Sequence, residues 1–327
     1  MIIAVDLSIQ LTHELSQSDK SEMRLLFESV FEKSFPPDLF DRKYLQSCLG
    51  YSWHALLRRD GRIVGAYSAI PVRYRFYGNE AMFAIGVDLM VAKNSRGRLS
   101  SIKDMIEGLH SSLAAAGVAF VFGCAREEMR PFHEKVSNWR SLGKVPYQIA
   151  LLRASQLGLA AVPAKVLLRG WNGLRQMAEW IHPAGSPKIE KICDAGFLKY
   201  RYNIFPVDYR VVHGAADTTG WYLTDPYYPI EGTPKGVRFG LLVDVTPFSR
   251  KAFDEAIGLI AAREPGLDYL AYQGFLPFQP ANTITVPERF ERKAWYAMGR
   301  ILRPDIVDER IFDIRAWNLN LSNGDLV

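Results

Sequence analysis

The sequence has few cysteines and no long hydrophobic run, and both absences limit where the protein works. Its 327 residues include only three cysteines, Cys48, Cys124 and Cys193, which are odd in number and far apart. This excludes the dense disulfide framework of a small secreted domain, so we expect reduced thiols and a cytoplasmic location. No segment has the uninterrupted apolar length of a membrane-spanning helix, and residues 1–10 have no basic stretch before their short apolar run. We therefore expect a protein that is neither exported nor embedded in a membrane.

Metals, nucleic acids and a cysteine nucleophile lack sequence support as well. The six histidines and the acidic residues show no metal-ligand spacing. Lysine and arginine number 40 against 35 aspartates and glutamates, and this net charge of +5 mildly favours anionic ligands or a membrane surface. Because the basic residues are spread along the chain without a recognised motif, we expect no nucleic-acid partner. Cys124 follows a buried apolar run with no neighbouring base, which is typical of a structural cysteine.

What is present is a pattern of helices and strands typical of an α/β protein. Apolar residues at helical spacing predict a helix over 21–34, and alternating residues predict antiparallel strands between 54 and 91. A second helix over 102–113 leads to 118–123, a continuous apolar run suited to a buried central strand. The second half predicts several further strands and a helix over 249–263.

These elements divide the chain into two lobes and a connector. We place the first lobe at residues 1–152, a helical connector at 153–185 and a second lobe at 186–327. The apolar connector is expected to pack between the lobes, and the alternative is that 157–181 lies on a membrane that carries a lipid-linked substrate. The order of elements in the second lobe echoes the first, which favours a structural repeat. The second lobe is rich in tyrosine and tryptophan, which more often form core than stack on sugars.

A short basic loop in the first lobe is the strongest functional signal. The apolar residues Leu89, Met90 and Val91 lead into a loop that contains Arg96, Gly97 and Arg98, and a helix begins with Leu99, Ser100 and Ser101. The first turn of a helix has N–H groups without intrahelical partners and carries partial positive charge, so this arrangement is suited to a pyrophosphate. The alternative is an ordinary surface loop with solvated arginines.

Together with two later segments, this loop resembles the GCN5-related N-acetyltransferase (GNAT) superfamily. The family's loop often has the form Val-His-Pro-x-Tyr-Arg-Gly-x-Gly, of which this sequence keeps Val91, Arg96 and Gly97. Residues 122–125 resemble the end of the family's fifth strand. Residues 132–139, Phe-His-Glu-Lys-Val-Ser-Asn-Trp, resemble the family's Leu-Tyr-Glu-Lys-Phe-Gly-Phe with one residue inserted.

The resemblance implies a fold and a subgroup. The fold is the acyl-CoA N-acyltransferase fold, a mixed and mostly antiparallel sheet flanked by helices, here in two tandem lobes of which the second lacks the phosphate loop. Residues 197–202 and 317–325 are similar to two-lobed members associated with bacterial surface-polysaccharide synthesis. The implied reaction is direct acylation of an amine, with acetyl as the default group and an amino sugar, small or lipid-linked, as the acceptor.

The resemblance also implies acetyl-CoA or another acyl-CoA as co-substrate. The expected binding residues are Leu89, Met90, Val91, Arg96, Gly97, Arg98, Leu99, Ser100, Ser101 and Ala125. Leu99 departs from the family, because a second glycine usually stands there and lets the backbone approach the phosphate closely. We therefore expect Leu99 to shift the co-substrate, weaken its binding or exclude it.

Four residues are candidates for proton transfer. Asp88 is the first choice for the base that receives the amine proton, and Glu127, with its neighbour Glu128, is the second. His133 stands where the family often places a tyrosine that protonates the departing thiolate. The alternatives are a buried structural carboxylate for Asp88, helix N-terminal charges for the glutamates, and a structural histidine. The alternative function is a non-catalytic module that keeps the fold and binds a glycan, a lipid or a protein, and the departures from the family at Leu99 and His133 favour it.

Overall fold

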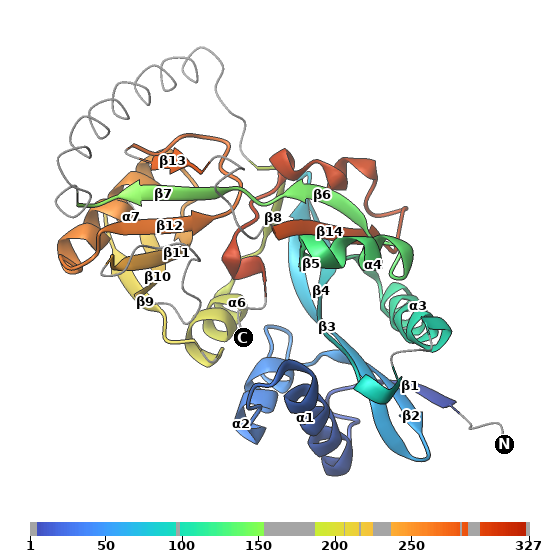
Figure 1. The fold of residues 1–327 in the computed structure, drawn as a ribbon. Helices are drawn as coiled ribbons and strands as arrows, with labels where there is room; N and C mark the ends of the chain where they lie inside the picture. Colours follow the sequence, from blue (N-terminus) through green and yellow to red (C-terminus); the bar gives the residue numbers. More distant parts are fainter. Residues whose placement is uncertain are drawn as a thin grey trace.

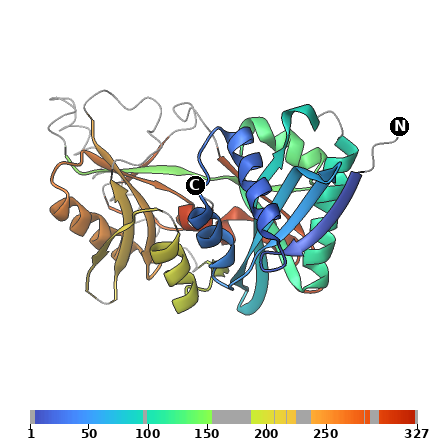
Figure 2. The same cartoon turned by 90° about the horizontal axis from the view of Figure 1, so that it is seen from below.

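Two mixed β-sheets lie side by side and form two lobes (Figures 1 and 2). The structure is a computed structural model, and it describes residues 5–95, 99–153, 187–205, 207–215, 217–224, 237–281, 283–286 and 295–324. The predicted connector at 153–185 lies almost entirely outside these ranges. The α/β class, the flanking helices and the two tandem lobes are confirmed.

The first sheet is antiparallel except at one pair of strands. Its order is β1 (Val5–Leu11), β2 (Trp53–Arg59), β3 (Arg62–Phe76), β4 (Asn79–Val91), β5 (Val118–Arg126), β14 (Trp295–Ile301) and β6 (Arg140–Lys144). The short strand β8 (Ile189–Lys191) pairs with the far end of β3. Only β4 and β5 run parallel. The predicted antiparallel strands between residues 54 and 91 are therefore confirmed as β2, β3 and β4.

The second sheet repeats this plan with fewer strands. Its order is β9 (Arg210–His213), β10 (Thr219–Thr224), β11 (Phe239–Thr246), β12 (Tyr269–Gln273), β7 (Tyr147–Leu151) and β13 (Thr283–Thr285). Again a single pair, β11 and β12, is parallel, and the helix α7 (Arg250–Arg263) connects the two strands. The predicted echo of the first lobe is visible in this order of elements.

The two sheets exchange strands. β7 follows β6 in the chain but pairs with β12 and β13 of the second sheet. In return, β14 from the end of the chain pairs with β5 and β6 of the first sheet. In Figure 1, β7 and β6 extend in opposite directions from the boundary between the lobes. A cut of the sequence at residue 152 therefore does not separate the two sheets.

Helices cover both faces of the first sheet. α1 (Gln17–Phe31), α2 (Pro37–Phe40) and the π-helical turn η1 (Asp41–Leu45) pack on the face that presents Leu56, Ala66 and Ile70. α3 (Leu99–Ala115) packs on the opposite face, because alternate strand residues such as Ala55, Leu57 and Tyr67 lie in its cluster. The α3 residues buried there include the apolar positions from which the sequence predicts this helix.

The remaining helical elements are short. They are η2 (Lys93–Ser95), η3 (Glu127–Met129), α4 (Arg130–Lys135), α6 (Ala195–Lys199), the π-helical turn η4 (Tyr200–Ile204), η6 (Glu309–Phe312), η7 (Ile314–Ala316) and η8 (Leu321–Asn323). The last three belong to the C-terminal segment, whose Trp317 is completely buried against Tyr74, Phe83, Phe120 and Phe122 of the first sheet. This aromatic cluster ties the end of the chain to the first lobe.

Candidate active site

The parallel strands β4 and β5 separate into a wedge. Their paired register ends at Ile85 and Phe122, although β4 continues to Val91 and β5 to Arg126. Beyond that point β4 still pairs with β3, and β5 still pairs with β14. The edges of β4 and β5 that face each other beyond Ile85 and Phe122 are thus not joined by a ladder. Because the strands are parallel, the wedge opens at the edge of the sheet where α3 begins.

The predicted phosphate loop lies at the mouth of this wedge. Arg96, Gly97 and Arg98 are outside the described residues, so their predicted role stays a prediction. Leu99 is the first residue of α3, and 59% of its surface is exposed. Ser100 is exposed and Ser101 half-buried in the same first turn. The expectation that Leu99 hinders phosphate binding stays a prediction too, since the loop before it is not described.

The strand residues predicted to bind the co-substrate have side chains that pack in the hydrophobic core. Met90 packs in the α1 cluster, and Val91 and Ala125 pack in the α3 cluster together with half-buried Leu89. Only their backbone groups therefore remain for a ligand in the wedge. This is the kind of contact expected from an extended arm that lies between two separated strands.

Asp88 lies on β4 inside the wedge region and has an unusual backbone conformation. Its φ is 50°, a left-handed value, and the β3–β4 register shifts between Ala66 and Ser68, so Asp88 forms a bulge. The bulge turns the carboxylate toward η1, where Asp88 Oδ2 lies 2.8 Å from Lys43 Nζ and accepts a hydrogen bond from the Tyr44 hydroxyl. The predicted base is therefore half of a buried ion pair.

Lys43 is completely enclosed, and sequence reasoning missed it. Its ammonium lies 5.6 to 5.9 Å from the ring centres of Phe27, Phe35 and Tyr44. A buried lysine requires a counter-charge, and Asp88 supplies it. In the sequence, Lys43 stands beside Tyr44 in a helical segment rich in aromatic residues. No sequence spacing connects this segment with Asp88, 45 residues later.

His133 lies on α4 and stacks on Trp139, with ring centres 4.9 Å apart and planes at 22°. Burial lowers the pKa of His133 to about 4, so the imidazole is neutral at pH 7. Its Nδ1 is 3.4 Å from the Ser137 hydroxyl. A neutral imidazole is a weaker acid than an imidazolium, so any proton transfer to a thiolate would use its N–H group rather than a positive charge.

The glutamates and the cysteine lie apart from these groups. Glu127 and Glu128 are exposed in η3, and within the described chain the Glu127 side chain makes no hydrogen bond or ion pair. Cys124 is exposed on β5 opposite Ala297 of β14. Among the residues that the structure describes, no group of three or more acidic, histidine or cysteine side chains is suited to a metal ion, and no helix is long and apolar enough to span a membrane.

Comparison with known proteins agrees with this geometry. Residues 12–136 match the family model described as "Acetyltransferase (GNAT) domain". The first lobe is thus similar to a GNAT domain over most of its length. The matched range includes α1, the wedge between β4 and β5, Asp88 and His133, whereas the second lobe lies outside it. The search of curated proteins gives no match.

Solved structures extend the likeness over both lobes. A probable N-acyltransferase from Enterococcus faecalis is 14% identical with a TM-score of 0.58, over 91% of this chain and 73% of its own. A GCN5-related N-acetyltransferase from Anabaena variabilis is 12% identical with a TM-score of 0.58, over 90% and 73%. Eis1 from Mycobacterium abscessus is 13% identical with a TM-score of 0.52, over 91% and 74%. At these identities the likeness shows the fold, so the chain has the acyl-CoA N-acyltransferase fold.

The second lobe has its own buried aspartate at the position that corresponds to the wedge of the GNAT domain. The register of β11 and β12 ends at Leu242 and Tyr272, and Asp244 follows two residues later. Its Oδ2 is 3.0 Å from Lys191 Nζ and 2.8 Å from the Tyr202 hydroxyl, which donates to it. Lys191 and Asp244 are both buried.

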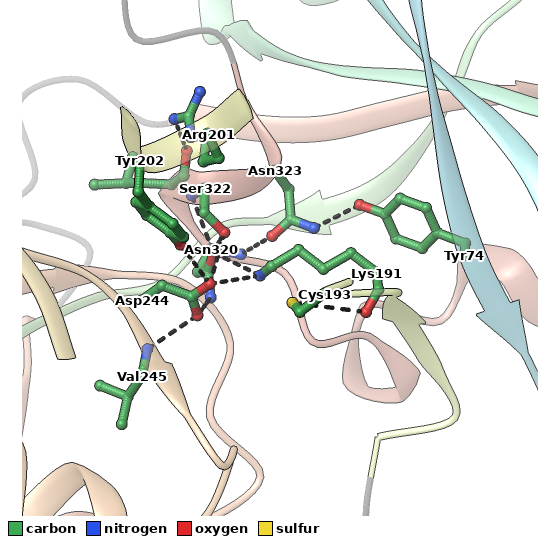
Figure 3. A network of polar contacts seen from close by, with 11 residues as sticks. Tyr74, Lys191, Cys193, Arg201, Tyr202, Asp244, Val245, Asn320, Ser322 and Asn323 are labelled. Carbon is green, nitrogen blue, oxygen red and sulfur yellow. Dashed lines mark hydrogen bonds and ion pairs between the residues drawn. The ribbon is translucent and has the colours of Figure 1, made fainter. Parts of the chain in front are cut away.

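The C-terminal segment completes the shell around Asp244 (Figure 3). Asn320 Nδ2 donates to Oδ1 over 2.8 Å, and the Ser322 hydroxyl donates to Oδ2 over 3.0 Å. The backbone N–H of Val245 also donates to Oδ1. Asn323 donates to the Tyr74 hydroxyl of β3 and so connects this network with the first sheet. Asp244 therefore has five partners, which is the surrounding of a structural carboxylate and leaves little capacity for catalysis.

Proposed function

We propose that this protein is an acyl-CoA-dependent N-acyltransferase that transfers an acyl group, acetyl by default, directly to an amine. The observation that carries the proposal is the wedge between β4 and β5, which has a carboxylate at its bulge and leads to the first turn of α3. The wedge lies within residues 12–136, the part of the chain that matches the GNAT domain.

The residues of the wedge fit an acyl-CoA. The β4–β5 register ends at Ile85 and Phe122, and the two strands continue past these residues without a ladder between them. The amide groups of a pantetheine arm are proposed to lie along these strand edges. The first turn of α3 and the arginines before it favour the pyrophosphate. When bound, acyl-CoA supplies an acyl thioester, whose carbonyl an amine attacks without a covalent enzyme intermediate.

Asp88 is proposed to receive the proton that the amine loses, either directly or through a water molecule. Tyr44 and Lys43 hold its carboxylate at the bulge, and Lys43 supplies a counter-charge beside it. His133 is proposed to assist the departing thiolate through its neutral N–H group. Glu127 remains a second candidate for the base, and its exposure suits a water-mediated route.

The acceptor is proposed to be an amino sugar of a surface glycan pathway, small or lipid-linked, with the second lobe shaping its site. This finer proposal is supported by the segments 197–202 and 317–325, which resemble two-lobed members of the superfamily. Tyr202, in the first of them, stacks on Trp221 with ring centres 4.2 Å apart and planes at 9°. We propose that the protein acts in the cytoplasm, and that contact with the inner face of the membrane would involve residues 157–181.

Calorimetry with acetyl-CoA and with free CoA tests the proposal, followed by a colorimetric assay for free thiol with a panel of amino sugars. We expect both ligands to bind and at least one amine to release CoA. Binding without thiol release from any amine would favour a module that keeps the fold without catalysis. Failure of both ligands to bind would remove the proposed function.

A further inference from the structure

The apex of the wedge is formed by two glycines on neighbouring strands. Gly86 on β4 and Gly123 on β5 are the first residues after the last paired positions, Ile85 and Phe122. They approach each other closely, because a Cβ atom built on Gly123 would lie 3.2 Å from the carbonyl oxygen of Gly86. The absence of two side chains here creates space on one face of the sheet, the face covered by α3 and α4.

One side chain, that of Trp139, occupies this space. Built Cβ atoms on Gly86 and Gly123 would lie 3.1 Å and 3.3 Å, respectively, from the six-membered ring of its indole. The Tyr67 hydroxyl, on β3, approaches Gly86 even more closely from the side. Both rings are buried, with 4% and 3% of their surfaces exposed, and they pack in the same cluster with α3. Two buried aromatic rings, those of Trp139 and Tyr67, therefore close the apex of the wedge on this face.

The opposite face of the sheet is filled by side chains of the described residues. There Ile85 and Phe122 lie in one hydrophobic cluster, and Phe122 packs against Tyr74 and Trp317 of the C-terminal aromatic cluster. Within the described part of the protein, an acyl chain that reaches the apex from the open end of the wedge therefore meets Trp139. Beyond the apex, β4 and β5 are paired and leave no gap.

Trp139 also has an unused polar group. Within the described chain its buried indole N–H has no hydrogen-bond partner, whereas the equally buried Trp317 donates its N–H to the carbonyl oxygen of Ile311 over 2.7 Å. Buried donors are usually satisfied, and an indole N–H can only donate. A carbonyl group of a ligand in the wedge is a partner of the required kind.

We infer that Trp139 is the residue that limits acyl length and restricts the donor to acetyl-CoA or another short acyl-CoA. The inference rests on the proposed function and adds the substrate class at the same site. In this role the Trp139 ring blocks acyl chains longer than a few carbons. Its indole N–H can donate a hydrogen bond to a carbonyl of the bound acyl-CoA.

The test measures affinity for free CoA and for acetyl-, butyryl- and octanoyl-CoA in the full chain. The variants are Trp139→Ala, which opens the apex, and Trp139→Phe, which shortens the wall and removes the N–H donor while it keeps a buried ring. We expect the wild-type protein to bind acetyl-CoA about ten- to a hundredfold more tightly than octanoyl-CoA, the range that pocket size can discriminate. Trp139→Ala should abolish or invert this ratio, and Trp139→Phe should reduce it.

Trp317→Phe is the matched control, because it shortens an equally buried tryptophan outside the wedge. It should lower stability and leave the ratio of affinities unchanged. Equal affinity of the wild-type protein for acetyl-CoA and octanoyl-CoA would overturn the inference and leave the proposed function intact. An unchanged ratio in folded Trp139→Phe and Trp139→Ala proteins would also overturn it. Absence of binding by every CoA species would overturn the proposed function and this inference together.

Discussion

Two buried aspartates, one on each sheet, are each paired with a lysine and a tyrosine but have different surroundings. In the first lobe, Asp88 pairs with Lys43 and with Tyr44 of the π-helical turn η1. In the second, Asp244 pairs with Lys191 and with Tyr202 of the π-helical turn η4. Each aspartate stands two or three residues past the last paired position, on the first strand of a parallel pair.

The difference lies in what surrounds each carboxylate. Asp88 contacts Lys43 and Tyr44 of one short helical segment, whereas Asp244 contacts the C-terminal segment and β8 as well as η4. The basic loop before α3 also has no counterpart before α7, where the sequence reads Val-Thr-Pro-Phe-Ser. In the first lobe the aspartate lies at the proposed acyl-CoA wedge. In the second lobe the aspartate belongs to the hydrogen-bond network that connects the two sheets.

The largest expected effect separates these two roles. Asp88→Asn should lower turnover by about 10²- to 10⁴-fold, the contribution typical of a positioned general base. Asp244→Asn should leave turnover of the folded protein nearly unchanged. Thiol release is measured for both variants at a temperature where circular dichroism shows them folded. A similar loss of turnover in both variants would contradict the division of roles.

Stability, in contrast, should depend on both ion pairs. Lys43→Met and Lys191→Met each leave a buried carboxylate without its counter-charge and should each cost about 3–5 kcal/mol in the free energy of unfolding. Urea denaturation measures this cost. Arg315→Met is the control, because its pair with Asp313 is exposed and should be worth at most about 1 kcal/mol. Equal effects for all three variants would show that burial of the pairs is unimportant.

Acidification should lower the free energy of unfolding mainly through buried histidines of the first lobe. Burial lowers the pKa values of His54 and His110 to about 3 and that of His133 to about 4, and all three lie in that lobe. Between about pH 6.5 and these values the unfolded chain binds a proton that the folded chain does not, so stability falls as pH falls, by about 1.4 kcal/mol per pH unit for each histidine.

His54 allows the cleanest measurement, because its two ring nitrogens lie 2.9 Å from the hydroxyls of Thr12 and Ser68. Denaturation of wild-type protein and of His54→Gln is compared between pH 7 and pH 5, where most carboxylates remain charged. The variant should be less stable at pH 7 and lose less stability on acidification, by about 2 kcal/mol over this range. Parallel pH profiles would refute the assignment.

The smallest effect concerns the loop that only the first lobe has. Arg96→Ala should weaken acetyl-CoA binding by about 5- to 30-fold, because it removes one charged hydrogen-bond donor to a phosphate. Arg250→Ala, at the start of α7, is the matched control and should not change the affinity. Calorimetry measures both variants. Equal losses would mean that the positive charge of the whole surface, rather than the loop, attracts the co-substrate.

Much of the fold follows from local pattern. The α3 stripe of apolar residues, the run 118–123 and the strands of the second lobe are visible in sequence because helix and strand periods are local properties. The resemblance that begins at Val91 agrees with the match of residues 12–136 to a GNAT domain. The sequence predicts Asp88 as the base from its place on the strand before the loop, and this role stays a prediction.

The exchange of β7 and β14 was not predictable, because strand partners are chosen by packing between segments far apart in sequence. The same holds for Lys43, whose role depends on an aspartate in another element, and for Trp139, which matters through its contact with two glycines of the central strands. In the sequence, Trp139 marks only the end of a family-like segment. Its function at the apex is a property of the assembled sheet.

The strand exchange also determines how the protein folds. The first sheet requires β14, which pairs with β5 from Trp295 to Ile301 and is synthesised more than 160 residues after Arg126, the last residue of β5. The first sheet therefore cannot be completed during synthesis before most of the second lobe has left the ribosome. Until then one edge of β5 is unpaired and open to other chains, and contacts of such long range form slowly. A truncated chain that ends near residue 152 should aggregate rather than yield a small active domain.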